Sequence, residues 1–357
     1  MATQTAYPSS ADYPVEAARP RHLALRLWLY AVAALIFAMI LVGGATRLTD
    51  SGLSITEWKP LLGAIPPLSE ADWHEAFEKY RQIPEYKIVN RGMSLAEFKT
   101  IYWWEWAHRF LGRFIGIAFF VPFALFLLMR VIPKGMLPRL AGIFVLGGLQ
   151  GALGWYMVMS GLSERTDVSQ YRLTAHLSLA VAILGAVLWC AFELRRWGEP
   201  AASTAPAGVK TGGYILAAAV FFQIMLGGFV AGTDAGLSHT TWPLMDGALI
   251  PDGLGAMQPW WRNLFENVLT VQFNHRMMGY LVAILAAVQL ALAWATRRNG
   301  IRLSAALVMG AVLGQIALGV ATLFTQVQIG VALAHQGGAV VVFALALHHL
   351  FMVRRAG

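Results

Sequence analysis

Four histidines occupy comparable places in this chain, and they are the residues best suited to carry chemistry. His108, His176, His275 and His335 each lie about one helical turn into a long apolar run. His108 and His275 both begin a His-Arg-x-x-Gly motif. Ionisable groups inside apolar segments are costly and usually functional, and a neutral imidazole is a common metal ligand. We therefore predict a metal or cofactor site that the sequence contains twice.

The composition indicates the elements that position these histidines. Of 357 residues, 57 % are apolar and 13 % are charged, whereas a soluble domain carries about 25 % charged residues. A membrane-spanning helix needs roughly 20 apolar residues. We predict an all-α integral membrane protein in which eight helices span the lipid bilayer, near residues 25–46, 104–129, 139–160, 172–193, 212–233, 270–295, 303–324 and 329–352.

The net charge of +8 indicates orientation rather than a nucleic-acid partner. With eight spans, both termini and the even-numbered loops share one side, where 14 basic residues stand against 4 acidic ones. The positive-inside rule therefore predicts that both termini are cytoplasmic. The single cysteine, Cys190, excludes an intramolecular disulfide and a CxxC metal site.

The chain also contains an internal repeat. Aligning Asp50 with Asp234 pairs Gly-Leu-Ser and a following tryptophan in both copies. Two more helix pairs share Gln-x-x-x-Gly and Ala-His. We predict two tandem pseudo-symmetric four-helix bundles that run in the same direction. The expected parts are a disordered cytoplasmic tail (1–22), a first unit (23–197), a flexible cytoplasmic linker (198–211) and a second unit (212–357).

The first unit has a long outer loop, residues 47–102, with two helix start signals. Ser69 is followed three residues later by Asp72, and Ser94 by Glu97; both are capping-box patterns. We predict a short amphipathic helix on the outer surface that stops near Pro84, and a second helix that leads into the 104–129 span.

Each unit supplies two histidines, which is the number that a haem iron takes as axial ligands. One histidine on each of two helices can bind opposite faces of one planar macrocycle. The alternative for a single histidine is a hydrogen bond inside the helix core, but four at equivalent positions favour two haem sites. Small residues that follow the histidines, such as Gly112 and Gly338, would leave room for a porphyrin. Zinc or copper fits less well because neither pair has a carboxylate or thiol at helical metal spacing.

Charged residues beside the histidines suggest further roles. Arg109, Arg113 and Arg276 are candidates to bind haem propionates, the alternative being contact with lipid head groups. Glu57 stands where the second repeat has Thr241, so it is a candidate for a function that only one unit performs.

Roles for four other residues are less clear. Glu105 and His239 have no role that the sequence settles. We expect His348 and His349 at the membrane interface.

These motifs resemble haem A synthase, the membrane enzyme that converts haem O to haem A for cytochrome oxidase. The Gly43–Trp58 run, the Glu105-x-x-His108-Arg109 motif and the Asn274-His275-Arg276 motif carry the resemblance, which covers nearly the whole chain after the tail. Because the outer loop contains no cysteine, the chain resembles the proteobacterial and mitochondrial branch of that family.

The resemblance implies an oxidoreductase acting on CH or CH2 groups, which oxidises the C8 methyl of haem O to a formyl group. It implies that His108 and His176 hold the substrate haem O, that His275 and His335 hold a resident haem b, and that Glu57 is needed for the oxidation. The implied location is the plasma (inner) membrane of a bacterium.

Two other functions use the same histidines: a di-haem b cytochrome that carries electrons from a quinol, and a transporter for an anionic substrate. The sequence leaves open the electron acceptor, the source of oxygen, whether the haem O synthase docks here, and whether the chain forms homo-oligomers.

Overall fold

The computed structural model of the chain describes residues 15–59, 62–163, 165–197 and 205–355, and the side chains of the first helix from residue 22 onward. Apart from one isolated bridge between Met245 and Ala248, the described residues form helices, turns and loops. In chain order the helices are α1 (Val15–Leu48), η1 (Leu62–Ala64), α2 (Glu70–Tyr80), α3 (Pro84–Ile88), α4 (Leu95–Leu128), α5 (Leu137–Ser163), α6 (Gln170–Arg195), α7 (Ala207–Gly232), η2 (Ala235–Leu237), η3 (Trp260–Leu264), α8 (Val268–Ala295), α9 (Asn299–Phe324) and α10 (Ile329–Arg354).

The eight predicted spans are confirmed. Among the described residues, eight helices are long and apolar enough to cross a membrane: α1 from His22 onward, then α4, α5, α6, α7, α8, α9 and α10. Each has at least 26 residues, which exceeds the roughly 20 that a bilayer core requires.

Both predicted helix starts in the outer loop are also confirmed. Ser69 caps α2 and Ser94 caps α4, each in a complete capping box. The apolar side of α2 is buried through Trp73 and Phe77, whose rings contact Tyr102 and Phe98 at the start of α4. Proline 84 does not stop α2, which already ends at Tyr80; it begins α3 instead, because proline is tolerated in the first helical turn.

Two expected boundaries differ from the structure. Residues 15–22, which we placed in a disordered tail, lie in α1, whose first residues Val-Glu-Ala-Ala-Arg include good helix formers. Residues 207–211, which we placed in the linker, form the first turn of α7 after Pro206. The remaining parts of the predicted tail and linker, residues 1–14 and 198–204, lie outside the described residues.

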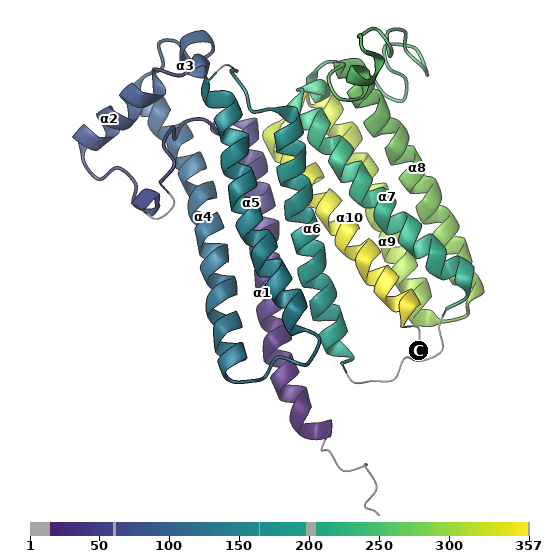
Figure 1. Cartoon of the computed structure of the whole chain (residues 1–357). Coiled ribbons are helices and arrows are strands. Elements are labelled where there is room, and N and C mark those ends of the chain that lie inside the picture. The colour runs from purple at the N-terminus through teal and green to yellow at the C-terminus, as the bar shows by residue number, and fades with distance from the viewer. Residues whose placement is uncertain (1–14, 60–61, 164, 198–204, 356–357) are drawn as a thin grey trace, which may run out of the picture.

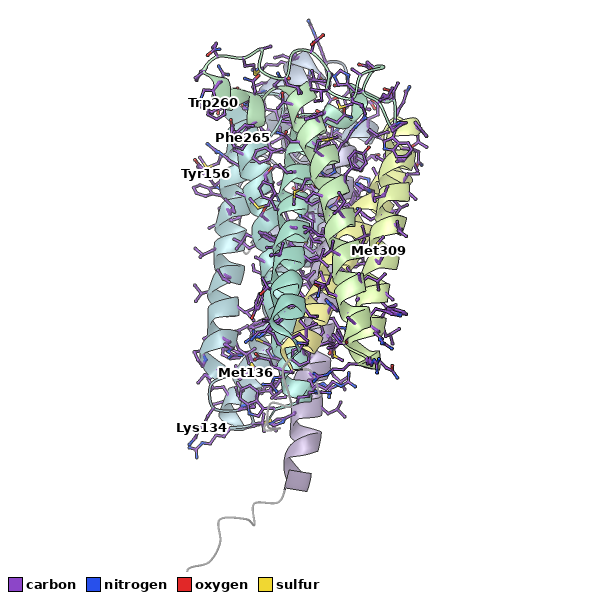
Figure 2. All side chains as sticks on the ribbon, turned by 90° about the vertical axis from the view of Figure 1, so that its right-hand side faces the viewer. Lys134, Met136, Tyr156, Trp260, Phe265 and Met309 are labelled. Carbon is purple, nitrogen blue, oxygen red and sulfur yellow. The ribbon has the colours of Figure 1, made fainter. Side chains whose placement is uncertain are left out.

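The spanning helices lie side by side, with α2 and α3 above one end of α4 and α5 (Figure 1). Helix α1 packs against α4 and α6, and α5 against α6; α7 packs against α8 and α10, and α9 against α8 and α10. Contacts of α6 with α7, and of α1 and α6 with α10, join these two sets. Figure 2 shows Trp260 and Phe265 near one end of the helices and Lys134 at the other.

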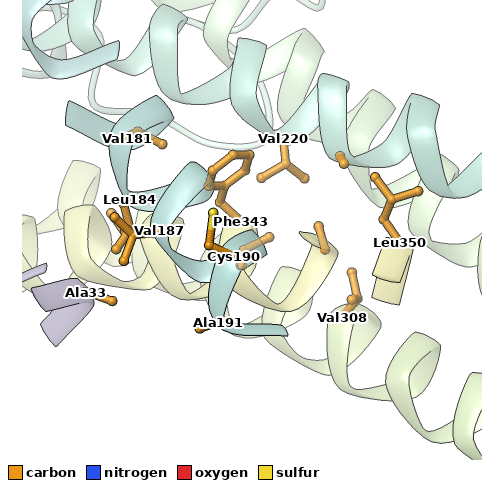
Figure 3. Close-up of a cluster of buried hydrophobic side chains, with 14 of the residues drawn as sticks. Ala33, Val181, Leu184, Val187, Cys190, Ala191, Val220, Val308, Phe343 and Leu350 are labelled. Atoms are coloured by element: carbon orange, nitrogen blue, oxygen red, sulfur yellow. The ribbon is translucent and has the colours of Figure 1, made fainter. Parts of the chain in front are cut away.

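The centre of the apolar core lies where the two sets meet. Figure 3 shows Val187 and Cys190 of α6 beside Val220 of α7 and Phe343 of α10. All four are buried. Helices α4 and α5 contribute only Phe119, Leu140 and Ile143 to the buried core, and 6 % of the most apolar stretch of each helix is buried.

Candidate functional site

The four predicted histidines lie on the even-numbered spans in chain order: His108 on α4, His176 on α6, His275 on α8 and His335 on α10. Three of them lie within the first two turns of their helix. His108 lies further along because the capping box at Ser94 starts α4 about two turns before the apolar segment. All four are partly buried.

His275 and His335 are close together and face each other. Their ring centroids are 6.4 Å apart, and the ring planes meet at 81°. A histidine nitrogen binds a first-row metal at about 2.0 Å, and the ring centroid lies roughly 1.1 Å beyond it, so two rings on opposite sides of one ion have centroids about 6.2 Å apart. Two axial rings can be rotated freely about the metal axis, so the angle is compatible as well. The spacing therefore fits one iron between the two imidazoles.

His108 and His176, the first predicted pair, face glycines on α1 and α5. They come from α4 and α6, just as His275 and His335 come from α8 and α10. The structure thus brings His275 and His335 together, and the pairing of His108 with His176 stays a prediction.

A glycine on the preceding span faces each imidazole. A Cβ atom added to Gly43, Gly154, Gly227 or Gly319 would lie 3.1, 2.9, 3.2 and 2.9 Å, respectively, from the ring of His108, His176, His275 and His335. Distances this short are rare for real Cβ atoms, so any side chain at these places would displace the ring. Glycine at these four places is therefore needed for the imidazoles to keep their observed positions.

These glycines differ from the ones to which we assigned a role in the sequence. An added Cβ on Gly338 would lie 2.2 Å from Gln315 Oε1, and one on Gly112 would lie 3.2 Å from Met39 Cε. The space beside Gly338 and Gly112 is therefore filled by side chains of neighbouring helices. That these two glycines make room for a porphyrin stays a prediction, which requires the ends of the Gln315 and Met39 side chains to move.

Three of the histidines are held by glutamines that the sequence interpretation missed. The Nε2 atoms of Gln150, Gln223 and Gln315 donate to the main-chain carbonyl oxygens of His176, His275 and His335, at 3.0, 3.0 and 2.7 Å. Each Nε2 also lies 3.1 to 3.4 Å from a nitrogen of the same imidazole. The signal that could have revealed them is a Gln-x-x-x-Gly pattern on α5, α7 and α9, in which the glycine faces the ring.

Arg109 of α4 and Arg276 of α8 make equivalent contacts with loop carbonyl oxygens. Arg109 donates to the carbonyl oxygens of Ile55 and Glu57, at 2.7 and 3.0 Å. Arg276 donates to those of His239 and Thr241, at 2.6 and 2.8 Å. The two loop segments correspond in the repeat alignment. Both arginines therefore fix the loop that follows the preceding odd-numbered span.

Glu105 has a clear structural role. Its side chain is 3 % exposed and forms an ion pair with Arg109 at 2.6 Å. It also accepts hydrogen bonds from Ser54 Oγ and the Ile55 main-chain N–H, both at 2.7 Å. In the second half, Gln272 takes this place and donates to the His239 carbonyl at 3.0 Å. The loop is thus held by a charged side chain, Glu105, in the first half and by a neutral one, Gln272, in the second.

Comparisons with known proteins agree with this geometry. Residues 26–347 match the family model of COX15-CtaA, cytochrome oxidase assembly protein. The chain belongs to this family. It is 52 % identical to the heme A synthase of Parvibaculum lavamentivorans over 94 % of this chain and 96 % of that protein. It is 54 % identical to the heme A synthase of Azorhizobium caulinodans, over 95 % and 96 % of the two chains.

The candidate catalytic residue of this COX15-CtaA family member, Glu57, lies on the outer surface. Its side chain is 44 % exposed and pairs with Lys59 and with Lys79 of α2, both at 3.0 Å. Hydrogen bonds from Lys59 and Lys79 hold the pKa of Glu57 below its ordinary value. The two lysine contacts favour the ionised carboxylate of Glu57.

Arg113 lies one turn beyond Arg109 and donates to the Lys59 carbonyl at 3.1 Å. Arg109 and Arg113 thus both donate to main-chain carbonyl oxygens of the loop that carries Glu57. The three arginines predicted to bind propionates thus all contact main-chain carbonyls in the structure.

Two further histidines have partners that the sequence did not indicate. His239 Nδ1 lies 2.5 Å from Asp246 Oδ2 in the outer loop of the second half. His349, which we placed at the interface, is fully buried and contacts Gln289 and Ser304 at 2.8 Å each. The interface prediction for His349 is wrong because its side chain points into the helix bundle, where Gln289 of α8 and Ser304 of α9 contact it.

Proposed function

We propose that this chain is a haem A synthase that oxidises the C8 methyl of haem O to the formyl group of haem A. The observation that carries the proposal is the 6.4 Å separation of the His275 and His335 rings, which suits a bis-histidine haem iron. Relatives named heme A synthase that are at least 50 % identical over nine-tenths of the chain support the specific reaction.

In this proposal the chain forms two tandem four-helix units, with α1, α4, α5 and α6 in the first and α7, α8, α9 and α10 in the second. The equivalent glycine, histidine and arginine contacts in the two halves support this division. Both termini lie in the cytoplasm and the protein spans the inner membrane of a bacterium many times. The distribution of basic residues supports that orientation.

The second unit would hold a resident haem b between His275 and His335, and the first would hold haem O between His108 and His176. The residues fit this group because paired imidazoles are a donor set that haem iron takes, and the 6.4 Å between the His275 and His335 rings suits an iron between them. When bound, the haem supplies the redox chemistry, and the protein supplies position and electrostatics.

The protein residues would have separate roles. The histidines fix the macrocycle, and Arg109 with Glu105 holds the loop that carries Glu57. An ionised Glu57 at the outer rim of the first unit would stabilise positive charge that develops near the methyl carbon. Its lowered pKa makes this electrostatic role a better match than that of a general base.

The test is expression in a bacterium that makes haem O but no haem A, followed by extraction and chromatographic identification of the haems. We expect haem A to appear with the wild-type chain and haem O to accumulate with Glu57→Ala while haem b is retained. Protein with both haems but no haem A product would instead support a di-haem electron carrier. Protein without any haem absorption would overturn the proposal.

A further inference from the structure

One of the four histidines lacks the partner that the other three share. Gln150, Gln223 and Gln315 each stand four residues before the glycine that faces the imidazole, but the first span has Met39 four residues before Gly43. We propose that Met39 makes His108 the exchangeable iron ligand, and that the three glutamines are positioning residues that hold the other ligands. This inference rests on the proposed function.

Met39 occupies the same space in the first half as Gln223 does in the second. Its Cε atom lies 3.2 Å from a Cβ built on Gly112, and Gln223 Nε2 lies 3.5 Å from a Cβ built on Gly279. Gly112 and Gly279 each follow their histidine by four residues. Met39 and Gln223 therefore occupy corresponding places beside the glycine that follows each histidine.

The chemistry of the two side chains differs in a way that affects an iron ligand. Each glutamine gives its N–H to the histidine carbonyl, and its Oε1 has no hydrogen-bond partner among the described residues. The same Nε2 atom lies 3.1 to 3.4 Å from a nitrogen of the imidazole, so each glutamine fixes both the main chain and the ring of its histidine. Such outer partners orient a ligating histidine. The methionine thioether is a weak acceptor and no donor.

The ring of His108 is also oriented differently from the others. Cε1 is the atom nearest to the facing glycine in His176, His275 and His335, whereas in His108 it is Nε2, 3.1 Å from a Cβ built on Gly43. The histidine without a glutamine is thus the one whose ring has turned. This second observation is independent of the hydrogen bonds.

The asymmetry suits what the two units must do. A resident haem needs two firmly held ligands, and the second unit provides them through Gln223 and Gln315. A substrate haem must enter and its product must leave, so one weak ligand in the first unit is an advantage. His176, held by Gln150, would keep the macrocycle in place while His108 dissociates from the iron.

Carbon monoxide is the probe, because it binds ferrous haem only where an axial ligand gives way. The protein is produced together with a haem O synthase, and pyridine haemochrome analysis establishes that both units are filled. We expect the reduced wild-type protein to bind one carbon monoxide per two haems. Met39→Gln should weaken carbon monoxide binding by about 10- to 100-fold, the usual effect of an outer partner on a metal ligand.

Gln223→Met makes the reciprocal change and should let the second haem bind carbon monoxide as well. Met39→Leu is the matched control, since it removes the sulfur without adding a donor, and it should behave as wild type. If Met39→Gln does not accumulate, Gln223→Met carries the test alone.

Two filled haem sites with unchanged carbon monoxide stoichiometry in Gln223→Met or Met39→Gln would overturn the inference and leave the proposed function intact. Wild-type protein that binds no carbon monoxide would also overturn it. Absence of haem altogether would remove the proposed function itself.

Discussion

Replacing Glu105 by alanine should destabilise the outer end of the first unit. The carboxylate is 3 % exposed and pairs with Arg109 at 2.6 Å, and it accepts from Ser54 and Ile55 at 2.7 Å each. Its removal would leave the Arg109 guanidinium, itself 14 % exposed, without its counter-charge. Breaking a buried pair from one side costs about 3 to 5 kcal/mol. Glu105→Gln keeps an acceptor but loses the charge, so we expect about 1.5 to 3 kcal/mol.

The free energy of unfolding would be measured by dodecyl sulfate titration, together with hydrogen exchange of the backbone near residues 53–58. Gln272→Ala is the matched control in the second half, because Gln272 makes one neutral hydrogen bond to a carbonyl. That variant should lose about 1 kcal/mol, and hydrogen exchange should not change near residues 53–58.

The reasoning is refuted if Glu105→Ala costs no more than Gln272→Ala. It is equally refuted if hydrogen exchange near residues 53–58 stays at the wild-type rate, because the ion pair would then not hold the loop.

Three further predictions follow from individual contacts. Gly319→Ala places a Cβ 2.9 Å from His335; we expect a cost of about 1 to 3 kcal/mol and loss of haem b, measured by haem extraction. Burial raises the pKa of Glu85 to about 8, so the folded state binds this proton more tightly than the unfolded chain. Stability should fall as pH rises from the ordinary carboxyl range through about 8, and thermal melting of Glu85→Gln should lack that fall. Hydrogen bonds from Lys59 and Lys79 lower the pKa of Glu57, so Lys79→Ala should shift the acid limb of the pH–activity profile to higher pH.

The spans and the histidines could be predicted from the sequence because both signals are local. Apolar length alone identifies a spanning helix, and the capping boxes at Ser69 and Ser94 mark where helices begin. The approach of His275 to His335 could be predicted because the repeat places two histidines on the second and fourth helices of each unit.

The partners of the charged residues could not be predicted in this way. Arg109 and Arg276 were assigned to propionates, but they contact carbonyls in loops more than 30 residues earlier in the chain. The sequence shows that an arginine needs acceptors, and it does not show that a loop returning over the helix end supplies them.

The glycines illustrate the same limit. Gly112 and Gly338 lie on the histidine helices, so their spacing suggested a porphyrin, yet side chains of neighbouring helices fill that space. The glycines that do face the rings, such as Gly154, lie on other helices. Their contribution depends on how the helices pack, and the residue spacing within one helix does not reveal which residues of another helix face it.

The most direct test of the central claim is electron paramagnetic resonance of the oxidised protein with both haems bound, compared with His335→Ala. The account predicts that the wild type has only low-spin ferric signals, because each iron has two imidazole ligands, and that His335→Ala loses the low-spin signal of one haem only. If His335→Ala retained both low-spin signals unchanged, His275 and His335 would not share an iron.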